Sequence, residues 1–112
     1  MIDKDLVAAS SRPLVLSILA QGESYGYALI QRVRELSGGQ LQWSDGMLYP
    51  VLHRLEEEGQ IESSWRVSET GRRRKYYRIC ATGQTELVRQ RQQWLAIHGT
   101  LTQLWETGLC PT

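Results

Sequence analysis

The sequence predicts a mainly α-helical fold with one small β-hairpin. Three short segments space their apolar residues at the helical period, two later segments alternate apolar and polar residues, and a last, longer segment returns to the helical period. With 112 residues, the chain has the length of one domain. We expect residues 1–81, including an N-terminal arm, to form one binding domain. Residues 82–112 should add a long helix to the same compact unit.

Composition narrows the classes of function. The chain has 13 Lys and Arg against 12 Asp and Glu, so affinity for a polyanion would have to come from local clustering of cations. We find no apolar run of transmembrane length and no secretory segment behind Met1, which favours a cytoplasmic protein that does not bind membranes. Cys80 and Cys110 have no zinc-site spacing and should be reduced thiols. His53 and His98 are the only histidines, so we expect neither a metal nor a cofactor.

The first two predicted helices lie between residues 11 and 36. Residues 1–11 should be an arm, with Ser11 capping a helix whose first turn contains Pro13 and whose residues 14–19 are almost all apolar. Ser24 should cap a second helix over about residues 25–36. Its core-facing stripe consists of Leu29, Ile30, Val33 and Leu36.

A third helix and a hairpin follow. Ser44 should cap a helix over about residues 45–58, which buries Leu48, Val51, Leu52 and Leu55 despite the awkward Pro50. Residues 61–67 and 75–80 alternate as strands, and residues 68–74 between them form a turn followed by a basic run.

From Thr82 to about Glu106 the helical pattern returns, with spacings of three and four residues as in a coiled-coil seam. At about 1.5 Å per residue this helix would be about 35 Å long, more than a small domain needs to cover its core. We therefore predict that it forms a dimer interface, made of Leu87, Trp94, Ile97, Leu101, Leu104 and Trp105.

Three short helices, a hairpin and a long helix, in this order, predict a winged helix-turn-helix with a C-terminal dimerisation helix. In that architecture the third helix enters the DNA major groove and the hairpin tip contacts the backbone or minor groove. Arg72–Lys75 place four cations at the tip, and arginine suits phosphate oxygens and base edges. The exposed face of the third helix adds Met47, Tyr49, His53 and Arg54, while Glu56–Glu58 should lie beyond the DNA backbone. Tyr25 could touch a phosphate beside the second helix or pack in the core.

Several motifs resemble the PadR family of bacterial transcriptional regulators. They are Gly26-Tyr27, Trp43-Ser44, Leu48-Tyr49-Pro50 with Leu52, Arg54-Leu55-Glu56 and Gly59, the wing run Arg73-Arg74-Lys75-Tyr76-Tyr77-Arg78, and Gly83 with Glu86-Leu87. The resemblance covers roughly residues 12–95. Met47 and His53 depart from it, since the family usually has Thr or Ser at the first position and frequently Lys at the second.

The resemblance implies a homodimeric winged helix-turn-helix repressor that binds a pseudo-palindromic DNA operator. It places Ser44 and Tyr76 among the DNA-binding residues beside those already named. The single last helix resembles the short branch of the family, some of whose members respond to aromatic compounds and carry a tryptophan at the matching place. We hypothesise that Trp94 and His98 line a site for a small aromatic effector.

The remaining residues of interest have structural interpretations. Trp43 and Trp65 are expected in the core, and Cys80 is expected to be a structural thiol. An alternative function is a winged-helix interaction module whose basic wing meets an acidic protein partner. An enzyme is disfavoured, because we recognise no catalytic triad and no paired carboxylates.

Overall fold

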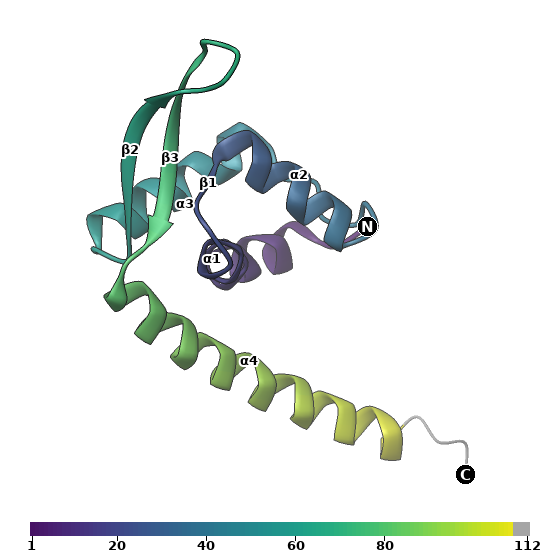
Figure 1. Cartoon of the computed structure of the whole chain (residues 1–112). Helices are drawn as coiled ribbons and strands as arrows, with labels where there is room; N and C mark the ends of the chain where they lie inside the picture. Colours follow the sequence, from purple (N-terminus) through teal and green to yellow (C-terminus); the bar gives the residue numbers. More distant parts are fainter. Residues whose placement is uncertain (109–112) are drawn as a thin grey trace.

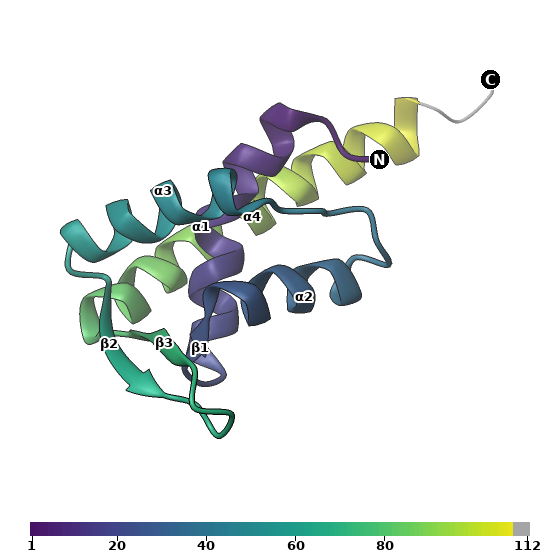
Figure 2. The same cartoon turned by 90° about the horizontal axis from the view of Figure 1, so that it is seen from above.

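The computed structural model describes residues 1–108, so Cys110 lies outside the described residues. The fold is mainly helical, with a small antiparallel sheet (Figures 1 and 2). The elements in chain order are α1 (Lys4–Ala20), β1 (Ser24–Tyr25), α2 (Gly26–Leu36), α3 (Asp45–Glu57), β2 (Ile61–Val67), β3 (Arg73–Ile79) and α4 (Ala81–Gly108). The predicted class, a winged helix-turn-helix with a long C-terminal helix, is confirmed.

The core lies where α1, α2 and α3 pack together beneath the sheet. Its fully buried side chains come from the predicted apolar stripes and from the first residue of β2: Val15, Leu16, Leu29, Val33, Leu48, Leu52, Leu55 and Ile61. Trp43 is buried among them, as expected. Leu36 is 60% exposed at the end of α2, so the predicted stripe of that helix is one residue too long.

The first helix begins much earlier than predicted. Lys4–Ala20 form one continuous α-helix, so the expected arm is wrong, and Ser11 is not a cap. Ser11 lies buried inside α1, where its hydroxyl donates to the Ala8 carbonyl at 2.7 Å. Pro13 lacks the N–H of an interior residue, but the helix continues through it. The part of α1 before the proline is held by Val7, which packs against the core.

The sheet has three strands rather than two. Its order is β1-β3-β2, and both strand pairs are antiparallel. Ser24 was predicted to cap α2, but it pairs with Tyr77 in β1, and Tyr25 occupies the cap position without a side-chain cap bond. We call β2, β3 and the turn over residues 68–72 the wing (Figure 1). Because β3 begins at Arg73, the basic run belongs mostly to a strand and not to the turn.

The third helix has the predicted boundaries and cap. Ser44 Oγ accepts the Met47 backbone N–H at 3.2 Å, which satisfies one of the otherwise unpaired amides of the first turn. Asp45–Glu57 then run without interruption through Pro50. The helix ends at Glu57 with Glu58 as its C-cap, and Gly59 follows with φ of +73°, the left-handed conformation that glycine adopts after helix ends.

The last helix leaves the body of the molecule. α4 has 28 residues and is therefore about 42 Å long, and its second half extends beyond the other elements (Figures 1 and 2). The radius of gyration is 16.4 Å, against about 13 Å for a compact chain of about 100 residues. Gly83 allows α4 to start close to β2, because a Cβ there would collide with the Gln60 carbonyl.

Candidate nucleic-acid interface

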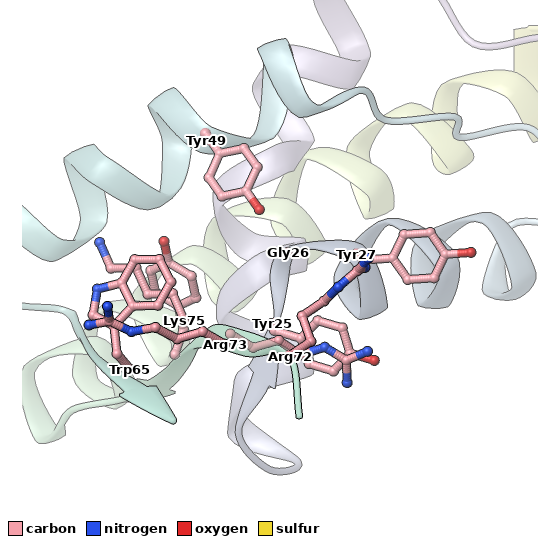
Figure 3. A pocket seen from close by; sticks show the side chains of 10 residues that line it. Tyr25, Gly26, Tyr27, Tyr49, Trp65, Arg72, Arg73 and Lys75 are labelled. Carbon is pink, nitrogen blue, oxygen red and sulfur yellow. The ribbon is translucent and has the colours of Figure 1, made fainter. Parts of the chain in front are cut away.

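An open hollow with a volume of about 610 Å³ lies between the start of α2, the exposed side of α3 and the wing (Figure 3). We call it the wing hollow. Five aromatic side chains, four cations and one glycine line it: Tyr25, Gly26, Tyr27, Tyr49, Trp65, Arg72, Arg73, Arg74, Lys75 and Tyr77. A nucleic acid has a chain of negative phosphates and flat bases. An open surface that carries both cations and aromatic rings is suited to contact it.

The wing tip is a tight turn that presents Arg72. The Ser68 N–H donates to the Arg72 carbonyl at 2.7 Å, and the Gly71 N–H donates to the Ser68 carbonyl at 2.9 Å. Ser68 Oγ also accepts the Arg72 N–H at 3.2 Å, so one serine closes the turn from both sides. Gly71 has φ of +83°, a left-handed conformation that favours glycine. The Arg72 side chain is exposed at the end of this ordered turn.

Each of the next three cations lies over an aromatic ring. Arg73 Cζ is 4.9 Å from the centroid of Trp65, Arg74 Cζ is 4.4 Å from that of Tyr25, and Lys75 Nζ is 5.6 Å from that of Tyr77. These are distances at which a ring face attracts a cation. A guanidinium that stacks by its flat face keeps its in-plane N–H donors free for another acceptor.

The third helix contributes Tyr49 to the same surface. Its ring reaches from α3 toward the start of α2 and is 45% exposed (Figure 3). The ring lies so close to Gly26 that a Cβ on that glycine would come within 2.8 Å of the Tyr49 Cζ atom. Gly26 therefore makes room for Tyr49 and fixes where its hydroxyl can lie.

His53 and Arg54 are exposed on α3 but do not line the wing hollow. His53 continues the helix face of Tyr49 one turn further on, and Arg54 follows it along the exposed side of α3. His53 Nε2 lies 3.2 Å from Glu57 Oε1, a pair that carries full charge only when the histidine is protonated. Surface pairs of this kind contribute little to stability, so His53 can exchange this partner for another.

Three other predicted residues occupy different places. Ser44 uses its hydroxyl to cap α3, and Met47 is half-buried against the core. Both residues line a separate hollow beside the first residues of the chain. Tyr76 contacts Tyr25 edge to face at 5.4 Å and lies under Arg66 at 3.9 Å, outside the wing hollow. Tyr25 is half-buried and contacts both Tyr76 and Arg74.

Glu56 is at the base of the wing and not beyond it. Ser63 Oγ donates to Glu56 Oε2 at 2.5 Å, and Lys75 Nζ lies 3.8 Å from Glu56 Oε1. This carboxylate therefore joins α3 to both wing strands. Glu57 and Glu58 point to other partners, His53 and Arg12. The three glutamates, predicted to lie beyond the DNA backbone, thus have three different sets of partners, and Glu56 contacts the wing.

Four residues that line the wing hollow were not predicted as binding residues: Gly26, Tyr27, Trp65 and Tyr77. Trp65 was expected in the core but is 56% exposed in β2, because only the first residues of that strand lie over the helices. Tyr27, 64% exposed, was noted only as part of a motif. Strand alternation could have placed Trp65 on this surface. Once the strand register is known, alternation puts Trp65 on the same face of the sheet as Arg73 and Lys75.

The predicted dimer seam is exposed in the single chain. Leu104, Ile97, Trp105 and Leu101 are between 39% and 60% exposed along the free half of α4, whereas Leu87 packs partly against the core. Trp94 is half-buried and lines an apolar hollow of about 450 Å³ between α1 and α4, together with Ile2, Leu6, Ser10, Pro13, Leu14, Ser17 and Leu41. His98, one turn further along α4, is exposed and does not line this hollow.

Cys80 is half-buried at the junction of β3 and α4. Burial raises the pKa of its thiol, and Glu62 raises the pKa further, so little of the reactive thiolate forms near neutral pH. Within residues 1–108 no cluster of three metal-ligating side chains occurs. No helix of this part of the chain has both the length and the apolar character needed to cross a membrane.

Known proteins were compared with the chain in sequence and in structure. Residues 15–89 match the model of the transcriptional regulator PadR-like family. The transcriptional regulator Rv3488 of Mycobacterium tuberculosis is 37% identical over 89 residues, which are 80% of this chain and 79% of that protein.

Solved structures agree in fold. A transcriptional regulator from Clostridium thermocellum superposes with a TM-score of 0.83 at 28% identity, over 92% of this chain and 97% of that one. A PadR-like transcriptional regulator from Bacillus cereus superposes with a TM-score of 0.79 at 30% identity, over 90% and 96% of the two chains. Members of this family regulate transcription by binding DNA and are not enzymes. This chain, with its winged helix-turn-helix and its long last helix, belongs to the PadR-like family of transcriptional regulators.

Proposed function

We propose that this chain is a cytoplasmic transcriptional repressor that binds a pseudo-palindromic operator as a homodimer and is released by a small aromatic ligand. Residues 1–81 would bind the DNA, and residues 82–112 would form the dimer. The observation that carries the proposal is the wing hollow, where Tyr49 of α3 faces Arg72, Arg73 and Arg74 of the wing across one open surface. Within residues 1–108 no carboxylate pairs with any of these three arginines, so their charge is available to phosphates.

The DNA would be contacted from two directions. The exposed face of α3, with Tyr49, His53 and Arg54, is placed to enter a major groove, and the wing is placed to lie along the backbone beside it. Tyr25 lines the wing hollow and Tyr76 packs against it, so both stay in the proposal. Ser44 and Met47 stay in it as residues of the first turns of α3. Two such units related by the dimer axis would bind half-sites about 34 Å apart.

A gel-shift experiment tests DNA binding directly. The probe is a palindromic fragment from the region upstream of the gene that encodes this chain, and the control is a random duplex of equal length. We expect retardation of both at low salt and of the palindrome alone at physiological salt. Failure to retard either duplex at low salt, together with capture of an acidic protein by the intact wing but not by Arg73→Ala/Arg74→Ala, would favour the interaction-module alternative.

The proposed effector site uses Trp94. Its ring lines the apolar hollow between α1 and α4, next to the seam that the second copy would cover. A flat apolar ligand would stack on the indole there, and His98 would add a polar group from the next turn. Binding at that place would change the angle between the two copies of α4 and so the spacing of the two recognition helices.

The effector proposal predicts a fluorescence change. A flat aromatic dye such as Hoechst 33342 should quench the indole fluorescence of the wild-type protein, and Trp94→Ala should abolish that quenching while the protein remains dimeric. Trp105→Ala is the matched control, because Trp105 is also on α4 but does not line the hollow. Equal quenching of the wild-type protein and of Trp94→Ala would remove Trp94 from the proposed site.

A further inference from the structure

Trp65 is unusual among the four tryptophans of this chain. Trp43 is buried in the core, and Trp94 and Trp105 lie on α4. Trp65 is 56% exposed on the β2–β3 hairpin and is not part of the hydrophobic core. An indole in such a position gains little from burial, so its role must come from what it contacts.

The strand register places Trp65 next to a cation. Trp65 pairs with Lys75, and Val67 pairs with Arg73, so Trp65 and Arg73 are diagonal neighbours on one face of the sheet. The Arg73 guanidinium lies over the indole, with its Cζ atom 4.9 Å from the ring centroid. Both side chains line the wing hollow, and Trp65 lies beside Arg73 and Lys75 there (Figure 3).

Arg74 shares this arrangement, with its guanidinium over the Tyr25 ring, but three other cations on β2 and β3 have carboxylate partners. Lys75 pairs with Glu56, Arg66 with Glu23 and Arg78 with Glu62. Arg73 has no carboxylate partner within residues 1–108, so among those residues the indole is the group that holds it. An aromatic face holds a guanidinium without occupying its N–H donors, whereas a carboxylate would occupy two of them.

We propose that Trp65 is a positioning residue for DNA binding: its indole fixes the Arg73 guanidinium with its donors directed at the nucleic-acid backbone. The proposal rests on the DNA-binding function proposed above. A free arginine samples many rotamers and loses that freedom when it binds a phosphate. An arginine already held against a ring loses less, so the same contact gives a higher affinity.

The test is a double-mutant cycle measured by fluorescence anisotropy with a labelled random-sequence duplex at low salt. A random duplex suffices, because a phosphate contact does not depend on sequence. Trp65→Ala should weaken binding about three- to tenfold, and Arg73→Ala should weaken it and lower the salt slope by about one. The double variant Trp65→Ala/Arg73→Ala should bind no more weakly than Arg73→Ala alone, because the indole acts only through that arginine.

Two further variants control for structure. Trp65→Phe keeps a ring face under Arg73 and should recover most of the affinity lost in Trp65→Ala. Val67→Ala removes another exposed apolar side chain from the same face of β2, 71% exposed, and should leave the affinity unchanged. Circular dichroism spectra should be equal for all variants.

The outcomes separate this proposal from the one it rests on. If the wild-type protein does not bind the duplex, both proposals fail. If the wild-type protein binds and Trp65→Ala binds equally well, only the role of Trp65 fails. The role also fails if the losses in Trp65→Ala and Arg73→Ala multiply in the double variant, because the indole would then act independently of Arg73, or if Trp65→Phe behaves like Trp65→Ala.

Discussion

At the scale of single residues, close contacts decide which side chains can reach DNA. Tyr49 belongs to α3, but its position is set by Gly26, on which no Cβ would fit without displacing the tyrosine ring. Both residues belong to sequence motifs that resemble those of the PadR family. Their contact could not be predicted, because it depends on the packing of α2 against α3.

Replacing Gly26 by Ala should therefore weaken DNA binding by displacing Tyr49, with a much smaller effect on thermal stability. In a Tyr49→Ala background the same change should have no further effect on affinity, since the displaced ring is absent. Affinities of the four proteins for one duplex give this cycle. Independent, multiplying losses would contradict the role assigned to the Gly26–Tyr49 contact.

The tryptophans show how far residue type predicts burial. Trp43 and Trp65 share a size and a preference for burial, and both were expected in the core. Trp43 precedes α3 and is only 5% exposed, whereas Trp65 lies where β2 has already left the helices. Strand alternation fixes the face on which Trp65 lies but not how far the helices extend beneath it.

Ionisation of Tyr77 should lower the stability of the folded protein at alkaline pH. Burial, reinforced by Glu56, raises the pKa of its phenol from 10.0 to about 12, so folding favours the neutral form. A group whose folded pKa is raised contributes stability below its unfolded pKa and loses it as the pH rises toward the folded value. We therefore expect the free energy of unfolding to fall by about 2 kcal/mol between pH 10 and pH 12.

Urea titrations at pH 10 and pH 12 measure this loss, and Tyr77→Phe should reduce it, because phenylalanine does not ionise. Absorbance at 295 nm provides a second measurement, since the Tyr77 phenol should ionise above its ordinary pKa of 10.0. A Tyr77→Phe protein whose stability falls as steeply as that of the wild type would contradict the assignment.

At the scale of elements, the wing is held against α3 by one carboxylate. Glu56 accepts from Ser63 of β2 and lies 3.8 Å from Lys75 of β3, so a single side chain joins α3 to both strands. The helices and the hairpin follow from periodicity and turn residues. The two-residue strand β1 could not be predicted, because two residues carry no alternation. The start of α1 was missed because Pro13 resembles a first-turn proline.

Glu56→Gln should strengthen DNA binding at low salt. Glutamine can still accept from Ser63, but the negative charge beside Lys75 is lost, so the lysine becomes available to phosphate. Glu62→Gln is the matched control, because it removes the same charge from the Arg78 pair outside the wing hollow. Anisotropy titrations at two salt concentrations should separate the variants, and an equal gain in both would show that only net charge matters.

At the scale of the whole molecule, charge and shape are unevenly distributed. The net charge is only +1, but three unpaired arginines gather in the wing hollow while other cations pair with glutamates elsewhere in residues 1–108. The extents of 63 × 29 × 21 Å reflect the projection of α4, whose seam residues Ile97, Leu101, Leu104 and Trp105 are exposed. Sequence spacing predicted this seam, because coiled-coil periodicity does not depend on the rest of the fold.

The dimer proposal predicts a change of mass. Leu101→Asp places a charge in the middle of the seam and should convert the dimer to a monomer in multi-angle light scattering. Operator affinity should fall with it, since a monomer engages one half-site only. Gln103→Asp is the control on the neighbouring face of α4 and should remain dimeric. A wild-type protein that is monomeric at micromolar concentration would overturn the dimer.

The salt dependence of DNA affinity tests the central claim most directly, namely that the wing and α3 form the DNA-binding surface. It compares the wild type with Arg73→Ala/Arg74→Ala and with Arg66→Ala/Arg78→Ala, a control that removes two cations paired with glutamates outside the wing hollow. In plots of log affinity against log salt, the wing variant should bind every duplex more weakly and lose about one unit of slope per lost phosphate contact. The control should keep a slope close to that of the wild type. An unchanged slope in Arg73→Ala/Arg74→Ala, or an equal loss in the control, would contradict the account.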